Sequence, residues 1–175
     1  FTLINGHTNI EDVSYININF YESTFIATRG LIEKGYREIT YVTPESDYFE
    51  IRERLRGYQE TMQQAGLDVQ ICYAEQVADQ IKTFRAVVTN KSDTAHMVMK
   101  EAIKQGLRIP ENFVLIAGNT EEYCDYLFPS LSSVKIPARE IGSAATGLLI
   151  DLLSNKNEFQ LPEFKCSIQY RQSMR

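Results

Sequence analysis

The sequence predicts an α/β protein with a doubly wound parallel sheet, and two observations support this fold class. First, short segments rich in β-branched and aromatic residues alternate with amphipathic segments of helical period. Second, several of the short segments are apolar throughout, which is typical of strands that helices cover on both faces. Parallel strands need crossover helices, and we expect those crossovers to be right-handed.

The central part of the chain shows this alternation most clearly. Four segments are rich in β-branched or apolar residues: 39–42, 69–73, 86–89 and 113–117. Between the first two, apolar residues spaced four and three apart over 51–65 predict a helix, with Asp47 as N-cap and Gly66 at its end. Shorter stripes of the same spacing predict helices over 77–84 and 95–103. The resulting order of strands and helices is that of a parallel sheet.

Two flanking regions extend this pattern. Before it, residues 15–18 resemble a strand and 21–33 a helix. After it, 131–134 resemble a strand, Pro137 leads into a helix, and 164–170 form a closing strand. Periodicity alone leaves open whether these regions complete the central lobe or begin a second one.

Composition argues against several classes of protein. The net charge of −5 makes the chain a poor ligand for polyanions such as DNA. The sequence shows no signal peptide and no apolar stretch approaching the ~20 residues that span a bilayer. Its three cysteines lack a Cys-x-x-Cys spacing, so we expect no structural disulfides and a cytoplasmic location. Because the chain does not start with Met, we also expect it to derive from a longer protein.

Sequence motifs for catalysis and nucleotide binding are missing. There is no phosphate-binding loop of the Gly-x-x-x-x-Gly-Lys type, no Gly-x-Gly-x-x-Gly and no Gly-x-Ser-x-Gly. The two histidines, His7 and His96, have no cysteine or histidine at metal-ligand spacing. We therefore expect a protein that is not an enzyme and needs no metal or cofactor.

The predicted strands place a set of polar residues at one edge of the sheet. Ligands of open parallel sheets bind beyond the carboxyl ends of the strands. Here these ends lead into the loops 43–49, 73–76, 90–93 and 118–123. Amides, carboxylates and hydroxyls beside aromatic rings suit a small polyhydroxylated ligand, because each sugar hydroxyl both donates and accepts hydrogen bonds.

Other interpretations of these residues remain open. Asp47 and Asp93 are equally suited to capping helices. Aromatic residues near strand ends belong to the core more often than to a ligand platform. By sequence alone, the charged segment 52–56, which contains Arg54, is more typical of a solvated helix face.

Five passages, in order along nearly the whole chain, resemble the LacI/GalR family of bacterial transcriptional repressors. Residues 31–39 are similar to the family's LI-x-x-GHR-x-I, with Tyr36 where histidine is usual. The other passages are Glu53–Tyr58 with Ala65–Gly66, similar to R-x-x-GY…G; Gly106–Ile116, similar to G-L-R-x-P-x-D-V-x-V; Pro129–Val134, similar to P-x-L-T-T-V; and Ile141–Gly142 with the helix that follows. Each passage is weak evidence alone, but five in family order indicate membership.

The resemblance implies a type I periplasmic-binding-protein-like fold, in which two Rossmann-like lobes close on an effector in the cleft between them. It implies one complete C-terminal lobe, 36–135 plus 166–175, and a truncated N-terminal lobe, 1–35 plus 138–164. It also implies a homodimer that contacts operator DNA only through an N-terminal helix-turn-helix head that this sequence lacks.

The resemblance assigns roles to particular positions. Arg54 falls on the arginine that often holds the effector. Asn119 and Thr120 stand where the family typically has two acidic residues, and Asn19, next to Phe20, stands where aspartate is common. Amides in place of carboxylates admit a more anionic effector. The effector contacts that we expect are Arg54, Asn119, Asn90, Asp93, Phe20, Glu22, Tyr48 and Thr120.

The function implied is that of a ligand-sensing and dimerisation region of a transcriptional regulator, with a sugar or sugar phosphate as effector. The alternative is a solute-binding protein of a sugar transporter, which shares the fold. Against it stand the missing signal peptide and the Gly106–Asn112 passage, which is more typical of the repressors. An α/β enzyme is the third class, and the sequence offers no catalytic set to support it.

Overall fold

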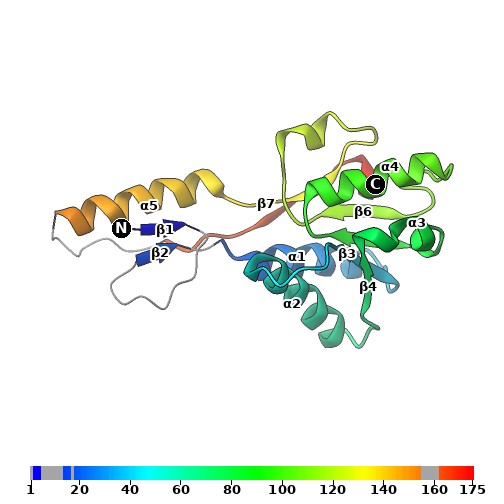
Figure 1. The fold of residues 1–175 in the computed structure, drawn as a ribbon, viewed down its shortest axis with the longest axis horizontal. Coiled ribbons are helices and arrows are strands. Elements are labelled where there is room, and N and C mark those ends of the chain that lie inside the picture. The colour runs from blue at the N-terminus through cyan, green and yellow to red at the C-terminus, as the bar shows by residue number, and fades with distance from the viewer. Residues whose placement is uncertain (1, 5–13, 17, 155–161) are drawn as a thin grey trace. The chain divides into compact units, whose positions relative to one another are not determined.

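The computed structural model of this chain describes residues 2–4, 14–16, 18–154 and 162–175. The chain forms two compact units. The smaller unit comprises Phe1–Asn19 and Ile136–Cys166, and the larger comprises Phe20–Lys135 and Ser167–Arg175. Each unit is described by itself below (Figure 1).

The larger unit is built on a six-stranded sheet in the order β4-β3-β5-β6-β7-β8. All neighbouring strands are parallel except the last pair, in which β8 runs antiparallel to β7. The strands are β3 (Ile39–Thr43), β4 (Gln70–Tyr73), β5 (Ala86–Thr89), β6 (Val114–Ala117), β7 (Ser132–Lys135) and β8 (Ser167–Gln169). This sheet confirms the predicted α/β fold class, with one antiparallel strand added at an edge.

Helices cover both faces of this sheet. Helices α1 and α2 lie on one face, whereas α3 and α4 lie on the other (Figure 1). Their bounds are α1 (Phe20–Glu33), α2 (Phe49–Gln64), α3 (Val77–Gln80) and α4 (Ser92–Lys104). Strands β3, β5 and β6 are buried along their whole length, which explains why their sequences are apolar on both faces.

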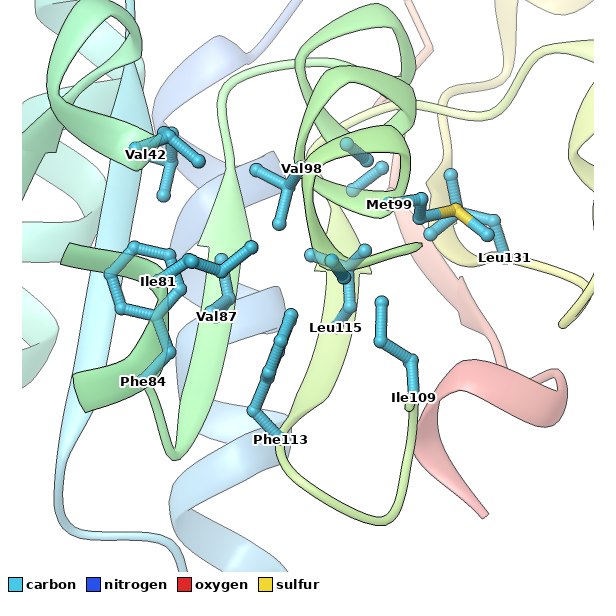
Figure 2. Packing of buried hydrophobic residues seen from close by; sticks show 14 of the residues in the cluster. Val42, Ile81, Phe84, Val87, Val98, Met99, Ile109, Phe113, Leu115 and Leu131 are labelled. Carbon is cyan, nitrogen blue, oxygen red and sulfur yellow. The ribbon is translucent and has the colours of Figure 1, made fainter. Parts of the chain in front are cut away.

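The hydrophobic core on the α4 side joins strands to helix. Figure 2 shows Val87 and Leu115, from β5 and β6, extending toward Val98 and Met99 of α4. Near the start of these strands the rings of Phe84 and Phe113 meet edge to face, with centroids 5.9 Å apart. This packing fixes α4 on the sheet, and with it the position of the helix N-terminus.

Helix α1 belongs to the larger unit, whereas we expected residues 1–35 to belong to the smaller lobe. The reason is its close packing on α2. The hydroxyl of Thr24 donates a 2.5 Å hydrogen bond to the backbone carbonyl of Arg54. At Gly57, an added Cβ would lie far inside van der Waals contact of the backbone oxygen of Tyr21, so the two helices touch through a glycine. Periodicity predicted this helix but carried no information on its partner.

The start of α2 also differs from expectation. Tyr48, not Asp47, occupies the N-cap, and no side chain caps the helix there. The backbone carbonyl of Tyr48 accepts hydrogen bonds from the N–H groups of Ile51 and Arg52. Asp47 is exposed and lies one residue too early in the chain for that position. The predicted Asp47 cap is therefore wrong.

The described residues of the smaller unit form a parallel pair of short strands and one long helix. The strands are β1 (Thr2–Ile4) and β2 (Ser14–Ile16), and the helix is α5 (Ala138–Leu153). Ile16 packs in a small buried cluster with Ile141, Ala144 and Ala145 of α5. The predicted helix after Pro137 is thus present, and its apolar stripe faces this cluster.

The contact between α1 and α2 can be tested at Gly57. Alanine is the better helix former by ~1 kcal/mol, but a Cβ at this position overpacks against the α1 backbone, which typically costs about 1–3 kcal/mol. We expect Gly57→Ala to lower the free energy of unfolding by up to about 2 kcal/mol in urea denaturation followed by circular dichroism. Gly142→Ala in α5 is the matched control: no atom lies within 4 Å of its Cβ, so that variant should gain about 0.5–1 kcal/mol. Equal behaviour of the two variants would contradict the proposed contact.

The hydroxyl of Tyr58 makes the fold sensitive to alkaline pH. It accepts a 2.8 Å hydrogen bond from the N–H of Gln70 and lies 2.8 Å from the carbonyl oxygen of Ile39, and burial raises the pKa of Tyr58 to about 12. The unfolded chain loses this proton near pH 10, so stability that is complete below pH 10 is lost as the pH rises through about 12. The two-unit difference corresponds to roughly 2–3 kcal/mol.

We expect Tyr58→Phe to reduce the slope of unfolding free energy against pH between pH 10 and 12. The same substitution at Tyr126, which is 87% exposed, should leave that slope as it is in the parent chain. An unchanged slope in Tyr58→Phe would show that this hydroxyl is not the group responsible.

Candidate functional site

Three parallel strands of the larger unit end at the same level, as the sequence predicted. Thr89 of β5 pairs with Val42 of β3 and with Ala117 of β6. The same pairing continues one residue beyond the strands. The N–H of Asn90 donates to the backbone carbonyl of Val42, and the N–H of Gly118 donates to that of Thr89. The loops after β3, β5 and β6 therefore leave from one edge of the sheet, which is called the carboxyl edge below.

Arg54 is buried beneath this edge, with 1% of its surface exposed. Its Nη1 donates hydrogen bonds to the Ser23 hydroxyl at 3.1 Å and to the Gly118 carbonyl at 2.8 Å. The guanidinium carbon lies 4.9 Å from the centre of the Phe20 ring, which adds a cation–π contact. The arginine thus connects α1, α2 and the loop after β6. With so little surface exposed, the guanidinium makes its hydrogen bonds to other groups of the protein.

An ion pair that the sequence analysis did not identify lies beside Arg54. One oxygen of Glu50, Oε1, is 3.5 Å from Nε of Arg54 and 3.1 Å from Nζ of Lys91. Glu50 and Lys91 are both partly exposed, with 31% and 38% of their side chains accessible. The i,i+4 spacing of Glu50 and Arg54 was a usable sequence signal. No local pattern could have indicated Lys91, because it comes from a different loop.

Asn119 lies at the carboxyl edge but serves the protein's own backbone. Its amide oxygen accepts a 2.8 Å hydrogen bond from the N–H of Ser92, the first residue of α4. Its amide nitrogen donates to Oε1 of Glu121 at 3.0 Å. The Ser92 hydroxyl in turn accepts a 2.9 Å bond from the hydroxyl of Tyr123. Asn119 therefore caps a helix from across the edge, which satisfies an N–H that the helix leaves without a partner.

Asn90 and Asp93 occupy different environments. Asn90 is 1% exposed, and its side-chain oxygen accepts a hydrogen bond from the Tyr41 hydroxyl at 3.2 Å. Burial raises the pKa of Tyr41. Asp93 is exposed, and its carboxylate accepts a 2.6 Å bond from the N–H of Thr94 in the first turn of α4. Asp93 is the second residue of α4, whose N-cap is Lys91, so this contact with the next residue is not a helix cap.

The remaining expected contacts are spread over the edge and beyond it. Phe20 is buried against Arg54, and Glu22 lies partly exposed in the first turn of α1. Tyr48 is 77% exposed in the loop after β3. Thr120 points toward the last two strands, with its hydroxyl 2.7 Å from that of Ser133. The structure thus brings Arg54 and Phe20 into contact and places Tyr48 and Thr120 in separate surroundings.

Two further observations concern metal-ligand clusters and membrane-spanning helices in the part of the chain that the structure describes. Among those residues, no three His, Cys, Asp or Glu side chains gather where they could hold a metal ion. His96 is exposed on α4, whereas His7 lies outside the described residues. Within the same ranges, the helices are all too short or too polar to cross a bilayer.

Comparison with known proteins places this fold among transcriptional regulators. A family profile described as a periplasmic binding protein-like domain matches residues 28–174. The chain is 27% identical over 158 residues to the HTH-type transcriptional repressor PurR of Aliivibrio fischeri, covering 79% of this chain and 46% of that protein. It is 28% identical over 156 residues to the HTH-type transcriptional regulator AscG of Escherichia coli, covering 81% and 46%. The chain therefore spans about half the length of these relatives.

Solved structures give the same result. The crystal structure of the E. coli transcriptional repressor AscG superposes with a TM-score of 0.87 at 27% identity, covering 99% of this chain and 68% of that chain. A sugar-binding transcriptional regulator of the LacI family from E. coli, crystallised with phosphate, also gives a TM-score of 0.87, at 26% identity, covering 99% and 67%. These matches confirm the resemblance to the LacI family that the sequence motifs indicated.

The helix-capping role of Asn119 gives a stability prediction. Removing the acceptor in Asn119→Ala leaves the Ser92 N–H without its cap, and we expect a loss of about 1 kcal/mol in the free energy of unfolding. Asn119→Asp retains an acceptor oxygen and places negative charge at a helix N-terminus, but it loses the donor to Glu121 and faces that carboxylate, so it should recover only part of this loss. Urea denaturation of both variants is the measurement. A fully stable Asn119→Ala chain would mean that the cap contributes nothing.

Proposed function

This chain belongs to the periplasmic binding protein-like domain family, and we propose that it is the effector-sensing part of a bacterial transcriptional regulator of the LacI type. The relatives reported above are regulators, which supports a role without catalysis. The alternative of a transporter's solute-binding protein shares the fold, but the named relatives favour the regulator.

The observation that carries this proposal is the carboxyl edge with its buried arginine. Arg54 is fixed by Ser23 and Gly118, and it lies next to a partly exposed carboxylate and ammonium, Glu50 and Lys91. Rigidly held polar groups beside aromatic side chains are the features of small-molecule sites, because a pre-ordered site loses little entropy on binding. We propose that a sugar or sugar phosphate binds at this edge, with Tyr48 as an aromatic platform.

The partners of the whole regulator follow from the same proposal. Operator DNA would be contacted by another part of the regulator, because this chain carries a net charge of −5. We place homodimer formation at an exposed apolar surface of the larger unit that comprises Ile103 and Phe128, which line a hollow of about 410 Å³. Arg108 and Glu111 line this hollow, and opposite charges on one surface allow reciprocal pairing between two copies of this chain related by a two-fold axis.

A ligand panel tests the sensing function. The panel comprises D-ribose, D-xylulose, D-glucose, their phosphate esters and inorganic phosphate, each measured by its effect on the melting temperature of the chain. A true effector at a hundredfold excess over its Kd stabilises the folded state by about 2.7 kcal/mol, which corresponds to a rise of roughly 5–10 °C. If every member leaves the melting temperature unchanged, the proposed function is wrong.

Arg54→Lys tests whether the buried arginine organises this site. Lysine keeps the charge but lacks the planar fork that reaches several acceptors at once. We expect effector affinity to fall at least tenfold, while the far-ultraviolet circular dichroism stays that of the parent. Arg56→Lys is the matched control, because Arg56 lies on the same helix in exposed pairs with Glu53 and Glu60.

A further inference from the structure

The polar groups at the carboxyl edge differ sharply in what they can offer a ligand. Arg54 is 1% exposed and already donates to Ser23 and Gly118. Asn90 is 1% exposed and accepts from Tyr41, and Asn119 caps α4. Glu50 and Lys91, in contrast, each have about a third of their side chains accessible.

We propose that Glu50 and Lys91 are the pair that recognises the effector, that Arg54 is the positioning residue that holds Glu50, and that the effector is a neutral hydroxyl-bearing molecule and not an anion. This inference rests on the proposed function and names the ligand class of the same site.

The geometry of the pair gives it a fixed orientation. Oε1 of Glu50 lies between two cations, 3.1 Å from Nζ of Lys91 and 3.5 Å from Nε of Arg54. Glu50 belongs to the first turn of α2, and Lys91 is the N-cap residue of α4, so the pair joins the loops that follow β3 and β5. Because the Arg54 guanidinium is itself anchored, the carboxylate beside it is held in one place.

A carboxylate next to an ammonium matches the chemistry of a hydroxyl group. The carboxylate accepts hydrogen bonds and the ammonium donates them, whereas a hydroxyl does both. One ligand hydroxyl therefore satisfies both members of the pair without displacing either. Two neighbouring hydroxyls on a sugar ring extend the same match.

The charges of the edge oppose an anionic ligand. Within 43–50, 90–93 and 118–123 the sequence has one lysine and, besides Glu50, five carboxylates: Glu45, Asp47, Asp93, Glu121 and Glu122. All five residues are exposed. A phosphate would have to compete with Glu50 for Lys91 while facing these like charges. A sugar phosphate is therefore expected to be a weaker ligand than the neutral sugar.

The test compares affinities on matched variants. Calorimetry would measure the tightest-binding neutral sugar of the panel, and its phosphate ester, on the parent chain, Glu50→Gln and Lys91→Met. Glu53→Gln is the control for the first variant, because Glu53 pairs with Arg56 on the same helix. Lys104→Met is the control for the second, because Lys104 pairs with Glu101 on α4.

We expect the neutral sugar to bind at least tenfold more tightly than its ester. Glu50→Gln and Lys91→Met should each weaken the sugar at least tenfold, while both controls stay within twofold of the parent. Arg54→Lys should weaken binding in the parent chain but not in the Glu50→Gln background, because a positioning residue acts only through the group that it positions. Circular dichroism confirms folding, and Glu50→Asp, which retains the charge but shortens the side chain, replaces Glu50→Gln if that variant does not fold.

Two results would overturn the inference and leave the proposed function standing: tighter binding of the phosphate ester, or unchanged sugar affinity in both variants of the pair. An equal loss from Arg54→Lys in the parent and in the Glu50→Gln background would assign Arg54 a direct contact and refute its positioning role. Absence of binding by every panel member would instead refute the proposed function, and this inference with it.

Discussion

Burying the positive charge of Arg54 requires acceptors and a counter-ion in place of the water that the guanidinium loses on folding. The chain supplies them from three elements: the Ser23 hydroxyl from α1, the Glu50 carboxylate from α2 and the Gly118 carbonyl from the loop after β6. Position 118 requires glycine, because a Cβ there would lie 2.9 Å from Nη1 of Arg54 and 2.6 Å from the backbone oxygen of Asn90. One charged group thus fixes the relative positions of two helices and a strand end.

The order of the carboxyl edge follows from similar internal contacts. Tyr41 holds Asn90, Asn119 caps α4, and Tyr123 holds Ser92. Polar residues that looked like ligand contacts in the sequence are therefore largely occupied in building the edge. A site whose supporting groups are fixed before the ligand arrives loses less entropy on binding, and its few exposed polar groups then determine specificity. The proposed role of Glu50 and Lys91 depends on this arrangement, because the neighbouring polar side chains already form hydrogen bonds within the protein.

Family membership and geometry answer different questions about this chain. The match over residues 28–174 identifies the periplasmic binding protein-like domain family, and the similarity to structures of LacI-family regulators indicates the class of protein. Neither finding says which side chains form a ligand site, because relatives at 26–28% identity differ at most positions. The burial of Arg54 and its ion pair with Glu50 are observed in this chain itself. They show which groups at the carboxyl edge are fixed by other parts of the protein.

The sequence by itself determined the fold class, because strand and helix periodicity is local and needs no partner to be recognised. It also drew attention to Arg54, through a motif and not through any physical signal. Only the tertiary structure decided what Arg54 contacts, since Ser23 lies 31 residues before it and Gly118 lies 64 residues after it. The same holds for the assignment of α1 to the larger unit, the cap from Asn119 to Ser92 across 27 residues, and the pairing of Lys91 with Glu50. Such contacts depend on how separate elements pack, and a pattern read along one element carries no information about its neighbour in space.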